Sequence, residues 1–245
     1  MRRWARRLGV TIVVLLLVVV GAGVALDEPL PTGASGAEAD ARARRMMAAV
    51  DADAWARTGA VRFVFAGRNH HLWDRTRGFA KVAWGDTEVI FDVSTRRGHA
   101  WRDGARLADP TDALDHAHAA WVNDTFWLNP LPKAFDAGVA REAVGEDGLL
   151  LRFGAGGRTP GDAYLFTLDA NGRPIRWAMW VSILPVGGLK ATWAGWVRLP
   201  TGAWVSTEHA IGPLDLRITD LEAAETLGEW VDGPDPFAAL VDNPP

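Results

Sequence analysis

Residues 46–65 read MMAAVDADAWARTGAVRFVF, and the spacing of the apolar side chains in this stretch changes at Gly59. From Ala37 to Thr58 the apolar residues recur every three or four positions, which predicts an amphipathic helix with one buried stripe. From Val61 to Phe65 the pattern changes to alternation along the chain, which is typical of a β-strand with one buried face. A helix followed by strands is therefore expected.

Three later segments repeat this alternation, and each is expected to bury one face of a strand. They are residues 88–93, 175–183 and 214–219. The dipeptides Asp103-Gly104 and Asn171-Gly172 are typical of hairpin turns, in which both central residues need a left-handed backbone. Residues 199–202 (LPTG) predict another tight turn. The strands therefore follow one another in a meander.

Two stretches interrupt the strands. Residues Pro110–Val122 begin with a proline and continue with alanines and histidines, which predicts a short helix. Residues 129–138 (NPLPKAFDAG) contain too much proline for a regular element. The fold class expected from these patterns is mainly β with few helices. Its large curved antiparallel sheet must either close into a barrel or carry helices on its concave side.

The N-terminal segment has the composition of an export signal. Four arginines within residues 1–7 precede an uncharged stretch from Leu8 to Leu26. Its densest part, residues 8–20, suits the core of a cleavable signal peptide. The whole stretch of 19 residues is just long enough to cross about 30 Å of hydrocarbon as a single membrane anchor. In both cases the rest of the chain is expected to be exported to the periplasmic side, because the basic flank stays in the cytoplasm.

The remaining chain divides into three parts by composition. Residues 27–36 are rich in proline, glycine and serine and predict a linker. Residues 37–228 are expected to form a single β-rich domain. Residues 229–245 predict a loosely packed C-terminal tail.

Charge and cysteine content exclude several classes of partner and site. The chain has 26 basic and 30 acidic residues, and residues 1–26 hold four of the basic ones and none of the acidic ones. The exported part therefore has a net charge of about −8, which argues against nucleic acid and anionic lipid headgroups as partners. With no cysteine, the domain has neither disulfides nor thiolate metal sites, and its core alone must stabilise it.

Tryptophan is unusually abundant, with 13 residues against a single tyrosine. Trp177 and Trp180 have opposite parity on one predicted strand, so their side chains point to opposite faces. The tryptophans line a cavity for an apolar ligand, fill the core under a curved sheet, or form a belt at the membrane-facing rim of an anchored protein. The residues whose strand parity places them on the interior face, and which are the candidate ligand-binding residues, are Phe63, Phe65, Phe91, Trp177, Met179, Trp193 and Val197.

The order of these elements resembles the LolA-like family of exported lipoprotein and lipid carriers. The motif-level similarity lies in residues 46–65, between an apolar leader and a long antiparallel meander. Residues 70–93 (HHLWDRTRGFAKVAWGDTEVIFDV) and 180–189 (WVSILPVGGL) look like those of uncharacterised exported relatives. The resemblance covers residues 37–225 as a pattern. It implies an unclosed β-barrel whose concave apolar side holds acyl chains beneath helices.

The expected function is accordingly the binding or shuttling of an apolar ligand, such as a lipid or an acylated protein, in a concave β-sheet cavity. Burial of an acyl chain would supply the affinity, at about 0.8 kcal/mol per CH₂ group. Such binding requires no covalent chemistry, so no catalytic residue, metal or cofactor is assigned.

Two other functions stay open. An envelope interaction or scaffold module would use the curved sheet to hold a partner without any ligand. A hydrolase or metalloenzyme would need the histidines and aspartates to converge, and no H-E-x-x-H spacing occurs. The side chains that such a site would use are His70, His71, Asp74, Asp115 and His116.

Overall fold

Two antiparallel sheets make up most of the protein in the computed structural model, which describes residues 27–154, 161–230 and 233–242. The predicted signal peptide or anchor at residues 1–26 lies outside the described residues. The strands are β1 (Ala60–Phe65), β2 (Asn69–Asp74), β3 (Phe79–Trp84), β4 (Thr87–Asp92), β5 (Gly98–Arg102), β6 (Ala105–Arg106), β7 (Val139–Val144), β8 (Gly148–Phe153), β9 (Ala163–Leu168), β10 (Pro174–Trp180), β11 (Leu189–Thr192), β12 (Ala194–Arg198), β13 (Trp204–Ile211) and β14 (Leu214–Ala224). The helices are α2 (Ala37–Ala49), α3 (Ala52–Arg57), α4 (Thr111–Leu128) and α5 (Ala238–Asp242), with 3₁₀ turns η1 (Leu131–Phe135) and η2 (Leu227–Glu229).

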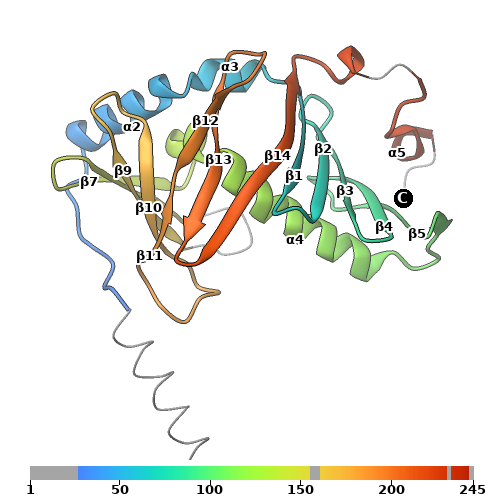
Figure 1. The fold of residues 1–245 in the computed structure, drawn as a ribbon, viewed down its shortest axis with the longest axis horizontal. Helices are drawn as coiled ribbons and strands as arrows, with labels where there is room; N and C mark the ends of the chain where they lie inside the picture. Colours follow the sequence, from blue (N-terminus) through green and yellow to red (C-terminus); the bar gives the residue numbers. More distant parts are fainter. Residues whose placement is uncertain (1–26, 155–160, 231–232, 243–245) are drawn as a thin grey trace, which may run out of the picture.

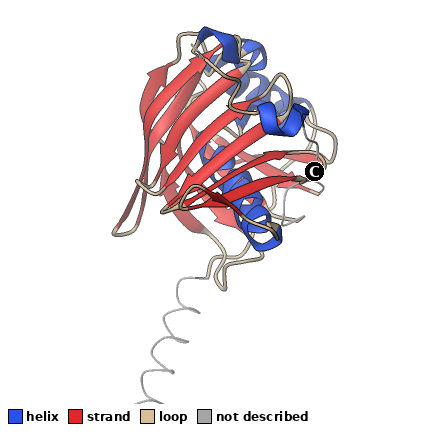
Figure 2. Cartoon of the chain, turned by 90° about the vertical axis from the view of Figure 1, so that its right-hand side faces the viewer, coloured by secondary structure: helices blue, strands red, loops and turns tan. Residues whose placement is uncertain are grey.

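The strands follow one another in a meander, as the turn signals predict. One sheet has the order β12-β13-β14-β1-β2-β3-β4-β5-β6, and the other has the order β11-β10-β9-β8-β7. The sheets form one curved wall that does not close into a barrel, α4 runs along its concave side, and α2 and α3 cross its upper edge (Figures 1 and 2). The expected fold class is confirmed. Within the described part of the chain, no helix is both long and apolar enough to cross a membrane.

The first predicted helix is divided in two. Asp51, between α2 and α3, has a φ of 51°, and this left-handed backbone interrupts the helix. Its carboxylate then accepts a hydrogen bond from the backbone N–H of Ala54 at 3.0 Å and caps α3. The expectation of one helix from residue 37 to residue 58 is therefore wrong at this point.

The helix on the concave side is longer than the sequence predicts. It continues past Val122 to Leu128, so that Trp127 also lies on α4. No proline or glycine occurs between Thr111 and Leu128, and Trp127 and Leu128 are buried. Tertiary packing thus extends the helix through residues of modest helix propensity.

Strand β10 departs from the simple alternation. A register shift between Pro174 and Arg176 turns Ile175 outward, where it is 48% exposed. The strand ends at Trp180, so Ile183 lies in the following loop and is 73% exposed. Both residues were expected on the buried face, because alternation reports faces only where a strand is regular and continuous.

The segment expected to be a linker lies against the five-stranded sheet instead, and we call residues 27–34 the N-terminal strap. Ala34 exchanges two backbone hydrogen bonds with Ala143 of β7, at 2.9 and 2.8 Å. Gly33 passes so close to β7 that a Cβ atom would lie 2.6 Å from the carbonyl oxygen of Ala143. Arg152 also donates a hydrogen bond to the carbonyl oxygen of Pro31 at 3.1 Å.

The described part of the C-terminal tail is packed. Phe237 is fully buried and Leu240 is 7% exposed, and both belong to a cluster with Ile90 on the face of the sheet that points away from α4. Arg77 holds the segment through a hydrogen bond of 2.9 Å to Asp235. The prediction of a loosely packed tail is wrong for residues 233–242.

His209 lies where the two sheets meet and gives the fold a pH dependence. It is fully buried, donates from Nδ1 to the carbonyl oxygen of Thr192 at 3.1 Å, and has rings of Trp127 and Trp193 at 5.2 and 4.8 Å. Burial lowers its pKa to about 4.

Because the unfolded chain binds a proton at this residue more readily, stability is full above pH 6.5 and falls as the pH drops toward 4. We expect protonation of His209 to lower the free energy of unfolding by up to about 3 kcal/mol between pH 6.5 and pH 4. Urea unfolding of the natural chain and of His209→Gln at pH 7, 6 and 5 measures the difference. If the free energy of unfolding falls equally with pH in both proteins, His209 is not the source of the pH dependence.

Candidate functional site

The interior face predicted from strand parity is largely buried in the structure. Six of the seven candidate residues are at most 7% exposed, namely Phe63, Phe65, Phe91, Trp177, Met179 and Trp193. Val197 is 39% exposed, so its predicted interior position is wrong. The strand is interrupted at Trp193, between β11 and β12, and the alternation therefore does not carry over to Val197.

These buried residues belong to two clusters. Phe91 packs with Ala113 and Ala117 of the first half of α4, whereas the others pack in the larger cluster around the second half of the helix. The indole of Trp177 lies 4.6 Å from the ring of Trp127 and 5.2 Å from that of Trp193. The interior around Trp177 is thus filled by the protein's own aromatic rings, and a ligand site has to be sought at the rim.

The histidines and aspartates of the enzyme alternative do not come together. His71 and Asp74 are both buried, but each pairs with a different partner, Asp124 and Arg77. The other three, His70, Asp115 and His116, are exposed. In the described residues, no group of three histidine, cysteine or acidic side chains is placed to hold a metal. These side chains therefore do not build the site that this alternative requires.

A buried polar network joins β2 to α4. The carboxylate of Asp124 accepts hydrogen bonds of 2.8 Å from His71 Nε2 and from Asn69 Nδ2, and its second oxygen accepts one from Asn123. The side chains of His71 and Asp124 are 0% and 2% exposed, and Phe63 stacks on the imidazole at 4.5 Å. The network fixes the helix on the sheet, and its burial keeps it away from any substrate in solution.

An open cleft lies at the upper edge of the sheet, where α3, the end of α4 and η1 meet. It has a volume of about 320 Å³ and is lined by Trp55 from α3, Asn129 after α4, and Trp73 and Arg75 at the end of β2. Met47 closes one side from α2. We call it the Arg75 cleft.

Arg75 is a half-buried cation of this cleft that forms no ion pair with any of the described acidic residues. Its Nη1 donates hydrogen bonds to the carbonyl oxygens of Trp55 and Thr58, and its guanidinium carbon lies 4.4 Å from the ring centre of Trp55 and 5.2 Å from that of Trp73. Its buried Nε has no hydrogen-bond partner within residues 27–154, 161–230 and 233–242. Burial lowers the pKa of the guanidinium to about 10, and over the described part of the chain no charged neighbour contributes to that shift. The group remains a cation at neutral pH.

Asn129 adds unsatisfied polar atoms to the same cleft. It is 4% exposed, and among the residues that the structure describes neither the oxygen nor the nitrogen of its side-chain amide has a hydrogen-bond partner. The buried indole N–H of Trp73 also has no partner in this part of the chain. A buried polar group without a partner costs about 1–3 kcal/mol, so a group that enters the cleft and satisfies these atoms gains that energy.

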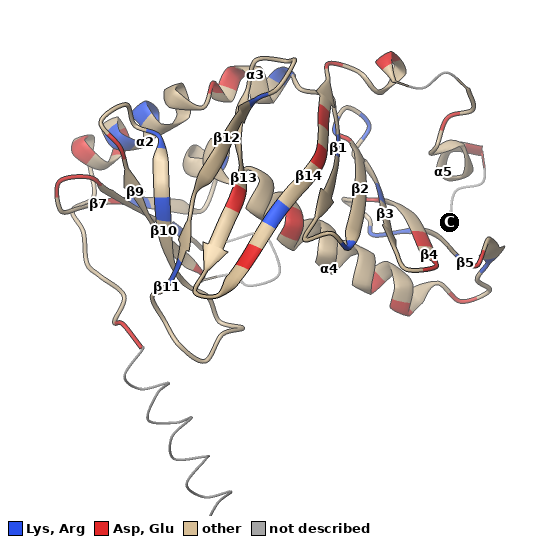
Figure 3. Cartoon of the chain, viewed as in Figure 1, with Lys and Arg blue, Asp and Glu red and all other residues tan. Residues whose placement is uncertain are grey.

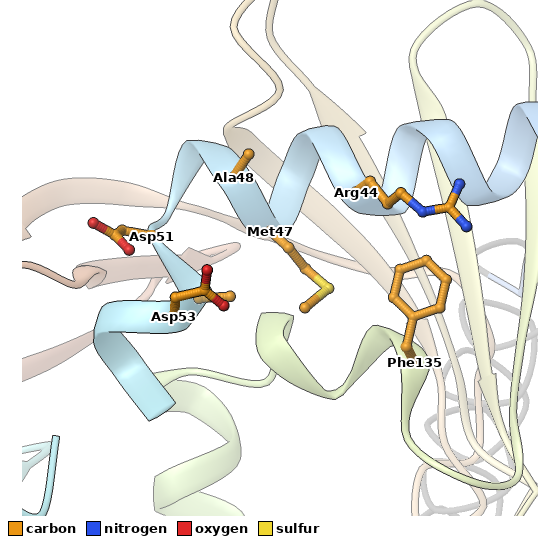
Figure 4. Close-up of a pocket in the computed structure, with 7 residues that line it drawn as sticks. Arg44, Met47, Ala48, Asp51, Asp53 and Phe135 are labelled. Carbon is orange, nitrogen blue, oxygen red and sulfur yellow. The ribbon is translucent and has the colours of Figure 1, made fainter. Parts of the chain in front are cut away.

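A second hollow continues the cleft along η1 (Figure 4). It has a volume of about 380 Å³ and shares Met47 and Asp53 with the Arg75 cleft. Phe135 is 38% exposed on its floor, and the guanidinium carbon of Arg44 lies 5.3 Å from the ring centre. The apolar part of this hollow is formed by Met47, Ala48, Ala52 and Phe135, and the charged residues Arg44, Asp51 and Asp53 complete its lining.

No pattern in the sequence marks Arg75, Asn129 or Asp124 as a functional residue. Residues 129–138 were expected to be irregular, and they form η1 and the wall of the cleft. The only sequence feature that could have indicated the cleft is the close spacing of Trp73 and Arg75. It indicates a site only when the fold places Trp55 and Asn129 beside this pair.

Comparison with known proteins gives no relative, since neither the family models nor the curated proteins match this chain. The resemblance to the LolA-like family therefore stays a prediction.

Proposed function

We propose that this protein is an exported binding protein for a small amphipathic ligand that carries one negative charge. The anionic group binds Arg75 and Asn129 in the Arg75 cleft, and the apolar part lies on Trp55, Trp73 and Met47. The observation that carries the proposal is the unpartnered buried amide of Asn129 beside a guanidinium without an acidic partner. The proposed ligand site therefore lies at the rim of the sheet, whereas the sequence predicted it beneath the sheet.

The charges around the cleft favour a carboxylate over a phosphate. Lys133 and Asp136, both on the lining, face each other at 3.5 Å and largely cancel. Asp53 adds a negative charge at the edge. Among the described residues that line the cleft, Arg75 is then the one cation available to a ligand, which favours a ligand with a single negative charge. The two oxygens of a carboxylate match the planar N–H donors of arginine.

The volumes support a ligand of modest size. A cleft of about 320 Å³ lies at the lower end of the usual range for small-molecule sites. A short alkyl chain attached to the carboxylate can continue into the hollow beside Phe135, where each buried CH₂ group contributes about 0.8 kcal/mol. A medium-chain fatty carboxylate satisfies both requirements.

We expect decanoate to bind and decanol to bind at least about tenfold more weakly, because a hydrogen bond to a charged group contributes about 1.5–3 kcal/mol. Isothermal titration calorimetry on the natural chain and on Arg75→Met measures this difference, and the variant should lose the preference for the acid. Arg57→Met is the matched control, since Arg57 is exposed on α3 and does not line the cleft.

Arg75 also holds two carbonyl groups, so a second variant separates binding from folding. Asn129→Asp keeps the shape of the side chain and places a negative charge in the cleft beside Arg75. It should unfold at the same urea concentration as the natural chain or a higher one, and it should no longer bind decanoate. Equal binding of decanoate by the natural chain, Arg75→Met and Asn129→Asp would overturn the proposal.

A further inference from the structure

The two most exposed large apolar side chains among the described residues lie at the lower end of the sheets. Ile183 is 73% exposed in the loop of residues 181–188 between β10 and β11, and Leu214 is 61% exposed at the turn between β13 and β14. We call this loop and turn the lower apolar edge. Neither the loop nor the turn contains a charged residue, whereas acidic and basic residues are interspersed along β14, beginning with Asp215 directly after Leu214 (Figure 3).

The strap begins at this same edge and is fixed to it. The carboxylate of Asp27 accepts a hydrogen bond from the backbone N–H of Gly187 at 2.7 Å, and Glu28 donates its own N–H to the Gly187 carbonyl at 3.1 Å. The indole N–H of Trp180 donates to the carbonyl oxygen of Glu28 at 2.7 Å, and Lys190 pairs with the Glu28 carboxylate at 2.6 Å. These contacts hold the start of the strap against residues 181–188.

The chain that precedes this point is the uncharged apolar stretch of residues 8–26. Its last residue, Leu26, is bonded directly to Asp27, and consecutive Cα atoms are about 3.8 Å apart. If the stretch crosses a bilayer, Asp27 lies at the membrane surface. Gly187, which is hydrogen-bonded to Asp27, must then lie there too.

We propose that the lower apolar edge docks on the surface of the bilayer that residues 8–26 cross, with Ile183 and Leu214 inserted between the lipids. The proposal rests on the retention of residues 8–26 as an anchor, and it is independent of the ligand in the Arg75 cleft. Trp180 is placed as interfacial tryptophans are, with its ring near the apolar zone and its N–H on a polar partner. The contact is apolar and needs no anionic lipid, which agrees with the acidic charge of the exported part.

The orientation that follows puts the ligand site on the side away from the membrane. The turn between β12 and β13, at the other end of these strands, meets the end of α3 through a 2.7 Å hydrogen bond between Thr201 and Thr58. Trp55 of the Arg75 cleft belongs to that helix. The cleft therefore opens toward the aqueous compartment.

The chain has no natural cysteine, so single probes can be placed without side reactions. We would introduce Ile183→Cys, Leu214→Cys or the control Arg57→Cys into the full chain, attach a polarity-sensitive fluorophore, and reconstitute each protein in phosphatidylcholine vesicles. The labels at positions 183 and 214 should show a blue shift on reconstitution and strong quenching by doxyl-labelled lipids. The label at position 57 should be quenched only by iodide in the solution.

Vesicle flotation tests the premise separately. A full chain that does not float with the vesicles lacks the anchor, and this result overturns the proposal at its premise. A chain that floats, but whose label at position 183 behaves like the label at position 57, overturns the docking itself. Neither result bears on decanoate binding, so the two proposals fail by different measurements.

Discussion

Replacing Trp177 by alanine is expected to lower the free energy of unfolding by about 3–5 kcal/mol. The indole is 1% exposed and packs among the rings of Phe126, Trp127 and Trp193. Its removal loses the transfer energy of the side chain and leaves a cavity that the surrounding rings cannot fill without leaving their rotamers. Urea unfolding followed by circular dichroism gives the value.

The same strand supplies the control for this variant. Ile175→Ala removes an apolar side chain that is 48% exposed, and it should cost no more than about 0.5 kcal/mol. Added indole should restore part of the lost stability of Trp177→Ala, because a ligand that binds only the folded state stabilises it by mass action. Equal costs for the two variants would show that Trp177 is not in a packed interior.

Asp124→Ala is expected to lower the free energy of unfolding by about 3 kcal/mol or more, because it leaves the buried His71 and the half-buried Asn69 without their acceptor. Unfolding of the variant at pH 7 checks the value. Asp112→Ala, at an exposed position on the same helix, is the control and should stay below about 1 kcal/mol.

A double-mutant cycle separates the energy of the interaction between His71 and Asp124 from the cost of leaving one of them buried without its partner. His71→Phe with Asp124→Leu removes both polar partners and places two apolar groups beside Phe63, so the double variant should be more stable than the sum of the single effects predicts. Additive costs would mean that the two side chains do not interact, in contradiction to their 2.8 Å contact.

The alternation of apolar residues predicted the mainly β fold because it reports which face of a strand is buried. In β1 it places Val61, Phe63 and Phe65 correctly in the interior, but Val64 on the opposite face is buried as well. It fails at Ile175, where a register shift turns the side chain outward, and at Val197, which follows a break in the strand. Such irregularities depend on the partner strand, which the local sequence does not specify.

The helices show where the sequence pattern fails to predict the ends of an element. The left-handed backbone of Asp51 divides a continuous apolar stripe, and the burial of Trp127 extends α4 beyond its local propensity. In each case a tertiary contact or a single backbone angle overrides a pattern that is correct on average.

The candidate site could not be read from the sequence for a related reason. Arg75 and Asn129 are ordinary polar residues in the sequence. What singles them out is that Arg75 Nε and the side-chain amide of Asn129 are buried without a hydrogen-bond partner among the described residues. That property depends on every neighbour in the fold. Asp124 is likewise distinguished from the exposed Asp112 and Asp115 only by the face of α4 that meets β2.

The N-terminal strap has one further consequence, for the solubility of the protein. β7 is the terminal strand of its sheet, and a free strand edge is a template on which another chain can add as a new strand and begin an aggregate. Ala34 occupies backbone groups of β7 at Ala143, and Gly33 lets the strap lie close enough to cover the neighbouring position. The N-terminal strap thereby hinders the pairing of another chain with this edge of the sheet.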